Sequence, residues 1–113
     1  YEEIGKWMAA SDVVTLPSWA EGTPNVVIEG LACGRRVVAS RVGGVPDLIT
    51  SATLGELVEA RQPAALARAL SDAVDVSYAP AEVARAAAFG DWHHSAGELH
   101  RVLRRAVDDH AAK

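Results

Sequence analysis

Three short, largely apolar runs alternate with segments of helical character, and this alternation restricts the folds open to the chain. The runs cover residues 13–16, 36–40 and 55–58. Pro, Gly or Ser residues bound them, and each is followed by a helix start signal or by apolar residues at helical spacing. Strands that alternate with helices form parallel sheets covered by those helices, so the pattern predicts an α/β fold.

The expected helices give the order α-β-α-β-α-β-α-α-α, with only three strands. They cover residues 1–10, 24–33, a short stretch from 46, 63–74, 80–89 and 91–113. A doubly wound sheet normally has more strands. We therefore predict a single partial domain over residues 1–113, a partial doubly wound (Rossmann-like) parallel sheet with a C-terminal helix over 91–113. The chain begins at Tyr1 inside an expected helix, which suggests that upstream sequence is missing.

Composition and charge exclude several classes of protein. Half of the 113 residues are hydrophobic and 23% are charged, as in an ordinary globular domain. The formal net charge is −4 with no evident basic face, so we expect no nucleic-acid partner. No apolar run approaches the ~18 residues that span a bilayer. We expect a cytoplasmic protein, with association at a membrane surface left open. Cys33 stands alone, so no internal disulfide can form, and we expect it to be a small buried helix residue.

The stretch from Glu21 to Glu29 concentrates the residues best suited to a ligand. It joins the end of an expected strand to an expected helix, with Thr23 as the cap and Pro24 as the first helical residue. In open α/β sheets, ligands bind outside the carboxyl ends of the strands, and a helix start offers free N–H groups to a phosphate. Gly22 allows the backbone to approach such a ligand closely.

The two glutamates would take different positions around a bound diphosphate. Glu21 lies in the loop at the mouth of the site, whereas Glu29 lies about 7–8 Å along the helix from Pro24. A carboxylate among Val, Ile and Leu neighbours needs hydrogen-bond partners, and ribose hydroxyls would supply them. Spacing alone equally allows Glu29 to lie on an exposed strip of the helix while Glu21 caps a loop.

This stretch resembles the E-x7-E signature of the GT4 family of retaining GT-B glycosyltransferases. The resemblance continues through ordered motifs over nearly all of the chain: Pro17-Ser18, Ala32-Cys33-Gly34, Val37-Val38-Ala39-Ser40, Gly43-Gly44-Val45-Pro46, Gly55-Glu56-Leu57-Val58 and Phe89-Gly90-Asp91-Trp92. It implies the C-terminal part of a GT-B nucleotide-sugar-binding domain.

The resemblance also implies roles for the residues of the stretch. Glu21 would be the catalytic residue, in contact with the donor sugar near the reacting centre, and Glu29 would bind the ribose hydroxyls of the nucleotide. The donor-binding residues whose backbone would contact the sugar and the diphosphate are Gly22, Thr23, Pro24, Asn25 and Val26. The helix dipole and basic groups would stabilise the leaving diphosphate.

An enzyme of this family would transfer a sugar, with retention, from a UDP-, GDP- or ADP-sugar to an acceptor, without a metal or another cofactor. The family's phosphate-binding Arg and Lys lie upstream in the same domain, and its acceptor site lies largely in an N-terminal domain. Neither is present in these 113 residues, so we expect the isolated chain to be inactive. The acceptor is not defined by the sequence.

Three positions depart from the family's pattern, and other functions stay open. Arg36 replaces a usual proline, Gly30 a common alanine and Asp47 a usual glutamate, which leaves any contact made by position 47 in doubt. The chain could also be a non-catalytic nucleotide-sugar-binding or interaction module of the same fold, or a nucleotide-sugar epimerase.

The remaining features point to no other chemistry. His93, His94 and His100 include no i,i+4 pair, so we expect no metal site. The Gly-Gly pair at 43–44 lacks the spacing of a dinucleotide-binding motif. The apolar stripe from Trp92 to Val107 is expected to pack in the core or against another domain.

Overall fold

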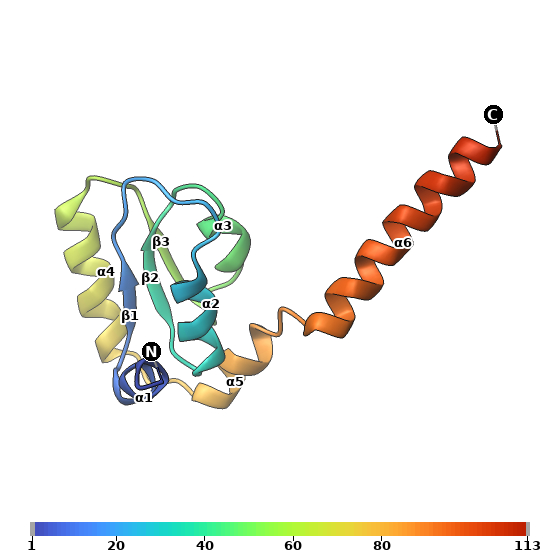
Figure 1. Cartoon of the computed structure of the whole chain (residues 1–113). Coiled ribbons are helices and arrows are strands. Elements are labelled where there is room, and N and C mark those ends of the chain that lie inside the picture. The colour runs from blue at the N-terminus through green and yellow to red at the C-terminus, as the bar shows by residue number, and fades with distance from the viewer. Residues whose placement is uncertain (1, 113) are drawn as a thin grey trace.

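A computed structural model describes residues 2–112 and has the predicted order of strands and helices (Figure 1). Its elements are α1 (Ile4–Ala10), β1 (Val14–Leu16), α2 (Asn25–Ala32), β2 (Val37–Ser40), α3 (Val45–Leu48), β3 (Gly55–Val58), α4 (Pro63–Asp75), α5 (Pro80–Ala86) and α6 (Trp92–Ala111). The α/β prediction is therefore confirmed.

The three strands form one parallel sheet in the order β1-β2-β3. Val14 of β1 pairs with Val37 of β2, and Val37 pairs with Gly55 of β3. Parallel neighbours cannot be joined by a tight hairpin, so each connection crosses over through a helix. A three-stranded parallel sheet with helices on both faces is the arrangement expected of part of a doubly wound domain.

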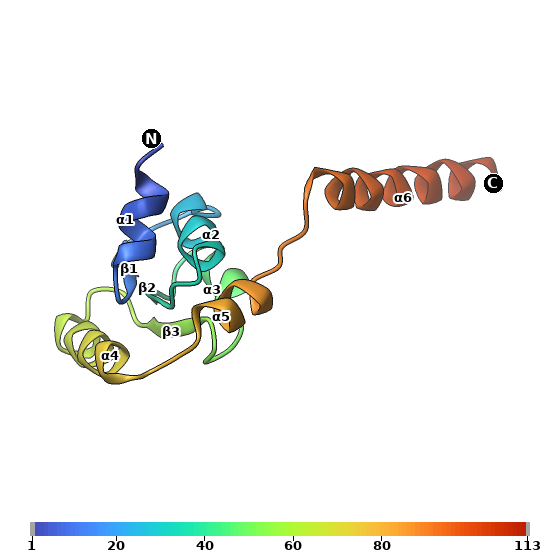
Figure 2. The ribbon, with the colours of Figure 1, turned by 90° about the horizontal axis from the view of Figure 1, so that it is seen from below.

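Strand side chains alternate between two cores, because successive residues of a strand point to opposite faces. Val37 and Ala39 belong to the main core, with Leu31 of α2 and residues of α3 and α5. Val38 and Val58 belong to a second core beneath α4. β2 is buried along its whole length because both of its faces are covered. Figure 1 shows α4 on one side of the sheet and α2 with α3 on the other, and Figure 2 shows α1 beside α2.

α2 begins one residue later than predicted, so the assignment of Thr23 as its cap is wrong. Pro24 is the N-cap, with an extended backbone at ψ 115°, and no side chain caps this helix. Thr23 Oγ1 instead packs against Gly44, 3.1 Å from where a Cβ of that glycine would lie. The Thr23 side chain therefore contacts a distant loop and does not make a local capping bond.

The buried face of α4 follows helical spacing. Ala69 and Ala73 are buried, and Leu66 and Leu70 pack partly against the same cluster. These positions follow the i, i+3, i+4, i+7 spacing of one helix face. Ala67 is exposed, because it lies about 100° around the helix from Leu66.

Cys33 is only half-buried, contrary to the prediction that it is a buried helix residue. It is the C-cap of α2, and its Sγ lies 3.8 Å from the carbonyl oxygen of Gly5, next to α1. The end of a helix leaves this side chain partly open to solvent. In α1 itself, only Met8 is buried, while Ile4 and Trp7 are exposed.

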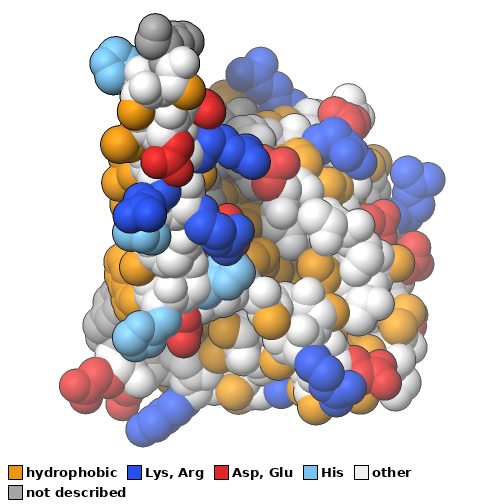
Figure 3. Space-filling view, turned by 90° about the vertical axis from the view of Figure 1, so that its right-hand side faces the viewer, with side chains coloured by type: hydrophobic (Ala, Val, Ile, Leu, Met, Phe, Trp, Pro, Cys, Tyr) orange, Lys and Arg blue, Asp and Glu red, His pale blue; other side chains and the backbone are white. Residues whose placement is uncertain are grey.

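The long helix α6 extends away from the rest of the molecule (Figures 1 and 2). It begins as predicted, with the carboxylate of Asp91 accepting a hydrogen bond of 2.9 Å from the N–H of His94. None of its described residues is buried, so of the two expected alternatives the stripe does not pack in this core, and packing against another domain stays a prediction. Figure 3 shows hydrophobic side chains along one flank of the helix and charged ones beside them. The stripe includes Leu99, Val102, Leu103 and Val107, all of them exposed.

We predict that Leu31→Ala lowers the free energy of unfolding by about 2–4 kcal/mol, because Leu31 is fully buried and its loss leaves a cavity. Leu99→Ala makes the same chemical change at a side chain that is 59% exposed, and should alter this free energy by less than about 0.5 kcal/mol. Urea unfolding followed by circular dichroism measures both variants. Equal losses of stability in the two would contradict the core assignment.

Candidate functional site

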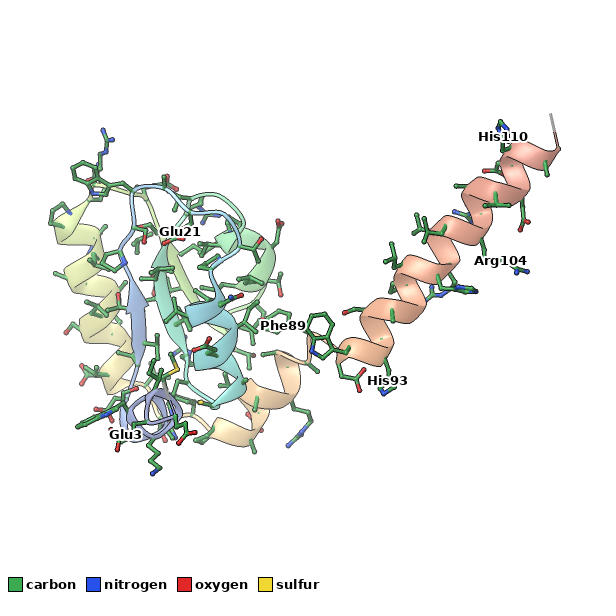
Figure 4. All side chains as sticks on the ribbon, in the orientation of Figure 1. Glu3, Glu21, Phe89, His93, Arg104 and His110 are labelled. Atoms are coloured by element: carbon green, nitrogen blue, oxygen red, sulfur yellow. The ribbon has the colours of Figure 1, made fainter. Side chains whose placement is uncertain are left out.

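The loops that follow the three strands gather at the carboxyl edge of the sheet. They are residues 17–24, 41–44 and 59–62. Figure 4 places Glu21 at this edge and Glu3 at the opposite end of the domain. Open parallel sheets bind ligands at their carboxyl edge. The structure therefore places Glu21 where the sequence predicts a ligand.

Glu21 is fixed by a hydrogen bond within its own loop. The hydroxyl of Ser18 donates to Oε1 of Glu21 at 2.6 Å, and both residues are half-buried. A bond to a carboxylate is stronger than one between neutral groups, so it limits the rotamers of Glu21. The sequence offered Ser18 only as part of a motif, and its contact with Glu21 was missed.

The Gly43-Gly44 turn packs directly against the loop of Glu21. The N–H of Gly44 donates to the carbonyl of Gly22 at 2.7 Å. Gly43 has a φ of +53°, and a Cβ there would lie 1.9 Å from the carbonyl oxygen of Glu21. Only glycine accommodates both the backbone conformation and the contact. The pair therefore supports the loop that carries Glu21.

The start of α2 presents its backbone beside Glu21. Pro24 is buried, whereas Asn25 and Val26 are exposed. No side chain caps the helix, so N–H groups of its first turn carry no capping bond. Such N–H groups, at the positive end of the helix dipole, are suited to an anion.

Glu29 occupies an intermediate position on α2. It is half-buried, and it shares its side of the helix with the exposed residues Val26 and Ala32. It lies about 6 Å along the helix axis from Asn25. Glu29 is thus less buried than the sequence suggested, and its position resembles the exposed strip that spacing alone allowed.

The three departures from the family's pattern have different surroundings. Gly30 is buried against Val14, where a Cβ would come within 3.2 Å of a methyl group, so the absent side chain brings α2 close to β1. Arg36 donates to the carbonyl of Ala52 at 3.0 Å, which is a local contact. Asp47 is exposed in the first turn of α3.

A small pocket of about 160 Å³ lies at the carboxyl edge on the side of α4. Trp19, Ser40 and Arg61 contribute to its wall. Trp19 belongs to the same loop as Glu21, but it lies towards α4, while the loop continues towards α2. The sequence does not reveal this pocket, because its residues come from two loops, the ends of β2 and β3, and the start of α4.

The histidines do not form a metal site. Within residues 2–112, no group of three or more His, Cys, Asp and Glu side chains is placed to hold a metal ion. Figure 4 shows His93 and His110 at opposite ends of α6. In the same part of the chain, no helix is both long enough and apolar enough to cross a bilayer.

Comparison with known proteins connects this geometry to a family. The model of a family described as glycosyl transferases group 1 matches residues 1–75. The chain belongs to this family. The match includes β1, α2, β2, α3, β3 and α4, and therefore the whole stretch from Glu21 to Glu29. It agrees with the resemblance that the sequence motifs indicated.

Individual group 1 glycosyl transferases resemble the chain over most of its length. A D-inositol 3-phosphate glycosyltransferase of Streptomyces scabiei is 38% identical over 96% of the chain, and one of Mycolicibacterium gilvum is 39% identical over 91%. The chain spans about a quarter of the length of these relatives, 25% and 24% respectively. Among solved structures, sucrose-phosphate synthase of Thermosynechococcus elongatus matches with a TM-score of 0.62 and 30% identity, over 88% of this chain and 27% of that one.

The contact between the two loops of this glycosyl transferase segment gives a test of its geometry. We predict that Gly43→Ala lowers the free energy of unfolding by about 2 kcal/mol or more, because the new Cβ meets the Glu21 carbonyl in a backbone conformation unfavourable to alanine. The same substitution at Gly22 meets no atom within 4 Å and should change stability by less than about 1 kcal/mol.

Thermal unfolding measures the stability of both variants, and the amide chemical shifts of residues 18–23 report the position of the loop. Gly43→Ala should move those shifts. A Gly43→Ala variant with unaltered stability and shifts would show that the two loops do not pack as described.

Proposed function

We propose that this chain supplies part of the donor site of a retaining glycosyltransferase that uses a nucleotide-sugar. The observation that carries the proposal is the position of Glu21, which Ser18 fixes at the carboxyl edge of the sheet beside the uncapped start of α2. A carboxylate next to a helix start suits a sugar attached to a diphosphate. The sugar hydroxyls can donate to the carboxylate while the helix N–H groups bind the phosphates.

Each residue of the stretch has a proposed role in this site. Glu21 contacts the donor sugar near the reacting carbon. The backbone of residues 22–26 contacts the sugar and the diphosphate, and Glu29 accepts hydrogen bonds from ribose hydroxyls further along α2. The half-buried position of Glu29 supports this role, since a carboxylate that is partly shielded from water binds hydroxyls more strongly than an exposed one.

The chemistry proposed for the site is stabilisation of charge on the leaving diphosphate. The positive end of the α2 dipole offsets part of the negative charge that develops as the glycosidic bond breaks. No metal or other cofactor is proposed. Additional cations would come from sequence outside these 113 residues, as would most of the acceptor site. The names of the relatives make a phosphorylated polyol the first acceptor to test.

We predict that Glu29→Gln weakens the binding of a nucleoside diphosphate by about tenfold, because an amide is a poorer acceptor for ribose hydroxyls than a carboxylate. Calorimetry of a full nucleotide-sugar-binding domain with UDP, GDP and ADP measures this loss of affinity and also identifies the base. Glu56→Gln is the matched control, since Glu56 is an exposed residue of β3 outside the proposed site. Absence of binding by all three nucleotides would favour a non-catalytic interaction module.

For catalysis, we predict that Glu21→Ala lowers the rate of sugar transfer by at least about 100-fold when the variant is made in the longer protein, while nucleotide binding changes little. The isolated chain of 113 residues should transfer no sugar. Full transfer by Glu21→Ala would remove Glu21 from the catalytic role. Sugar products formed without any acceptor would indicate an epimerase.

A further inference from the structure

The pocket on the α4 side of the carboxyl edge is lined by apolar, polar and charged side chains. Val38 and Ser40 are alternate residues of β2 and therefore share the face that α4 covers. Val38 packs into the core beneath α4. Ser40, two residues further along the strand, lines the pocket. Ser40 as a whole residue is only 4% exposed. A hydroxyl on the wall of an open pocket can donate a hydrogen bond to a ligand.

Arg61 brings a positive charge to the same pocket. Its guanidinium lies over the ring of Trp19, 4.6 Å from the centroid. An arginine stacked in this way is held in one plane while the N–H groups at its edge stay available. Neither of the two ion pairs within residues 2–112 includes Arg61. Its N–H groups are therefore not neutralised by a carboxylate.

The other charges near the pocket do not cancel that of Arg61. Glu59 also lines the pocket, but its Oε1 pairs with Nε of Arg41 at 3.0 Å. α4 begins at Pro63 on the rim of the pocket, with no side-chain cap, so its positive end adds to the charge of Arg61. The pocket is small, about 160 Å³, and suits a single compact anionic group.

The backbone at Arg61 supports a role for its side chain. Arg61 has a φ of 61°, the left-handed conformation that glycine adopts freely and other residues disfavour. Among the residues described, it is the single non-glycine residue with a positive φ. Glycine would relieve the strain but remove the guanidinium, so the strained arginine points to a use for its charge.

We propose that Trp19, Ser40 and Arg61 form a subsite for a phosphate or carboxylate group of a substrate, separate from the donor diphosphate at the start of α2. Arg61 binds the anion through two of its N–H groups, Trp19 orients the guanidinium, and the Ser40 hydroxyl donates a further hydrogen bond. That the anion belongs to a sugar-transfer substrate rests on the proposed function. The anion site itself rests on the pocket alone.

The test uses the whole 113-residue chain and its amide NMR spectrum. Inorganic phosphate, glucose 6-phosphate and glucose are titrated at constant ionic strength. Phosphate and glucose 6-phosphate should shift the amides of Trp19, Ser40 and Gln62 to saturation, whereas glucose should not. In Arg61→Gly, which keeps the backbone conformation favourable, the affinity for phosphate should fall by about tenfold or more. Arg68→Ala removes an exposed arginine of α4 and should leave the affinity unchanged.

A separate titration with UDP distinguishes the two sites. UDP should shift amides of residues 22–29, and Arg61→Gly should not alter its affinity. The proposal is overturned if phosphate leaves the pocket amides unmoved, if Arg61→Gly binds phosphate as tightly as the parent chain, or if glucose gives the same shifts. It is also overturned if UDP saturates the pocket amides, since the subsite would then belong to the donor. If a nucleotide-sugar-binding domain that includes the upstream strands binds phosphate at the pocket but binds no UDP, the proposed function is refuted and the anion subsite stays in place.

Discussion

The hydrogen bond from the Gly44 N–H to the Gly22 carbonyl determines the form of the carboxyl edge. It joins the loop after β1 to the turn after β2, and at 2.7 Å it brings the two backbones together. The contact is possible because Gly43 has no side chain to meet the carbonyl of Glu21. An eight-residue connection without this contact would sample many conformations, and ordering it would oppose ligand binding. Because this contact forms when the chain folds, the loop loses its conformational entropy then and not on ligand binding. Glu21 and the start of α2 are therefore positioned before a ligand arrives.

The sequence predicted the elements that depend on local patterns. The predicted bounds of β3 are those of the structure, and the predicted bounds of β2 differ by one residue. Short apolar runs bounded by turn residues allow few other positions for a strand. The start of α6 was placed within one residue, and its Asp91 cap is a bond between residues only three apart. The predicted Thr23 cap was wrong for the opposite reason. Thr23 lies against Gly44, about twenty residues later, and no local rule detects such a contact.

The sequence predicted where in the fold the candidate site lies, but it did not predict the contacts of the individual side chains. Glu21 lies at the expected edge, but the Ser18 hydroxyl that fixes its carboxylate follows from the shape of the loop rather than from a motif. Glu29 was expected on a mostly buried part of the helix, yet it is half-buried between the exposed residues Val26 and Ala32. Helical periodicity gives the angular position of a residue, but the degree of burial depends on which elements pack there. For Glu29 the proposed role combines this half-buried position with the family resemblance.

One short loop connects both sides of the carboxyl edge. Trp19 lies towards α4 and stacks on Arg61, Glu21 is fixed by Ser18, and the backbone of Gly22 is bonded to the turn before α3. Only Ala20 separates Trp19 from Glu21, so a single stretch of backbone carries both the residue that stacks on Arg61 and the proposed catalytic carboxylate. The close approach of Gly43 to the Glu21 carbonyl holds this backbone from the side of α3, and the stacking of Trp19 on Arg61 holds it from the side of α4. The same loop therefore positions both the proposed donor site and the proposed anion subsite.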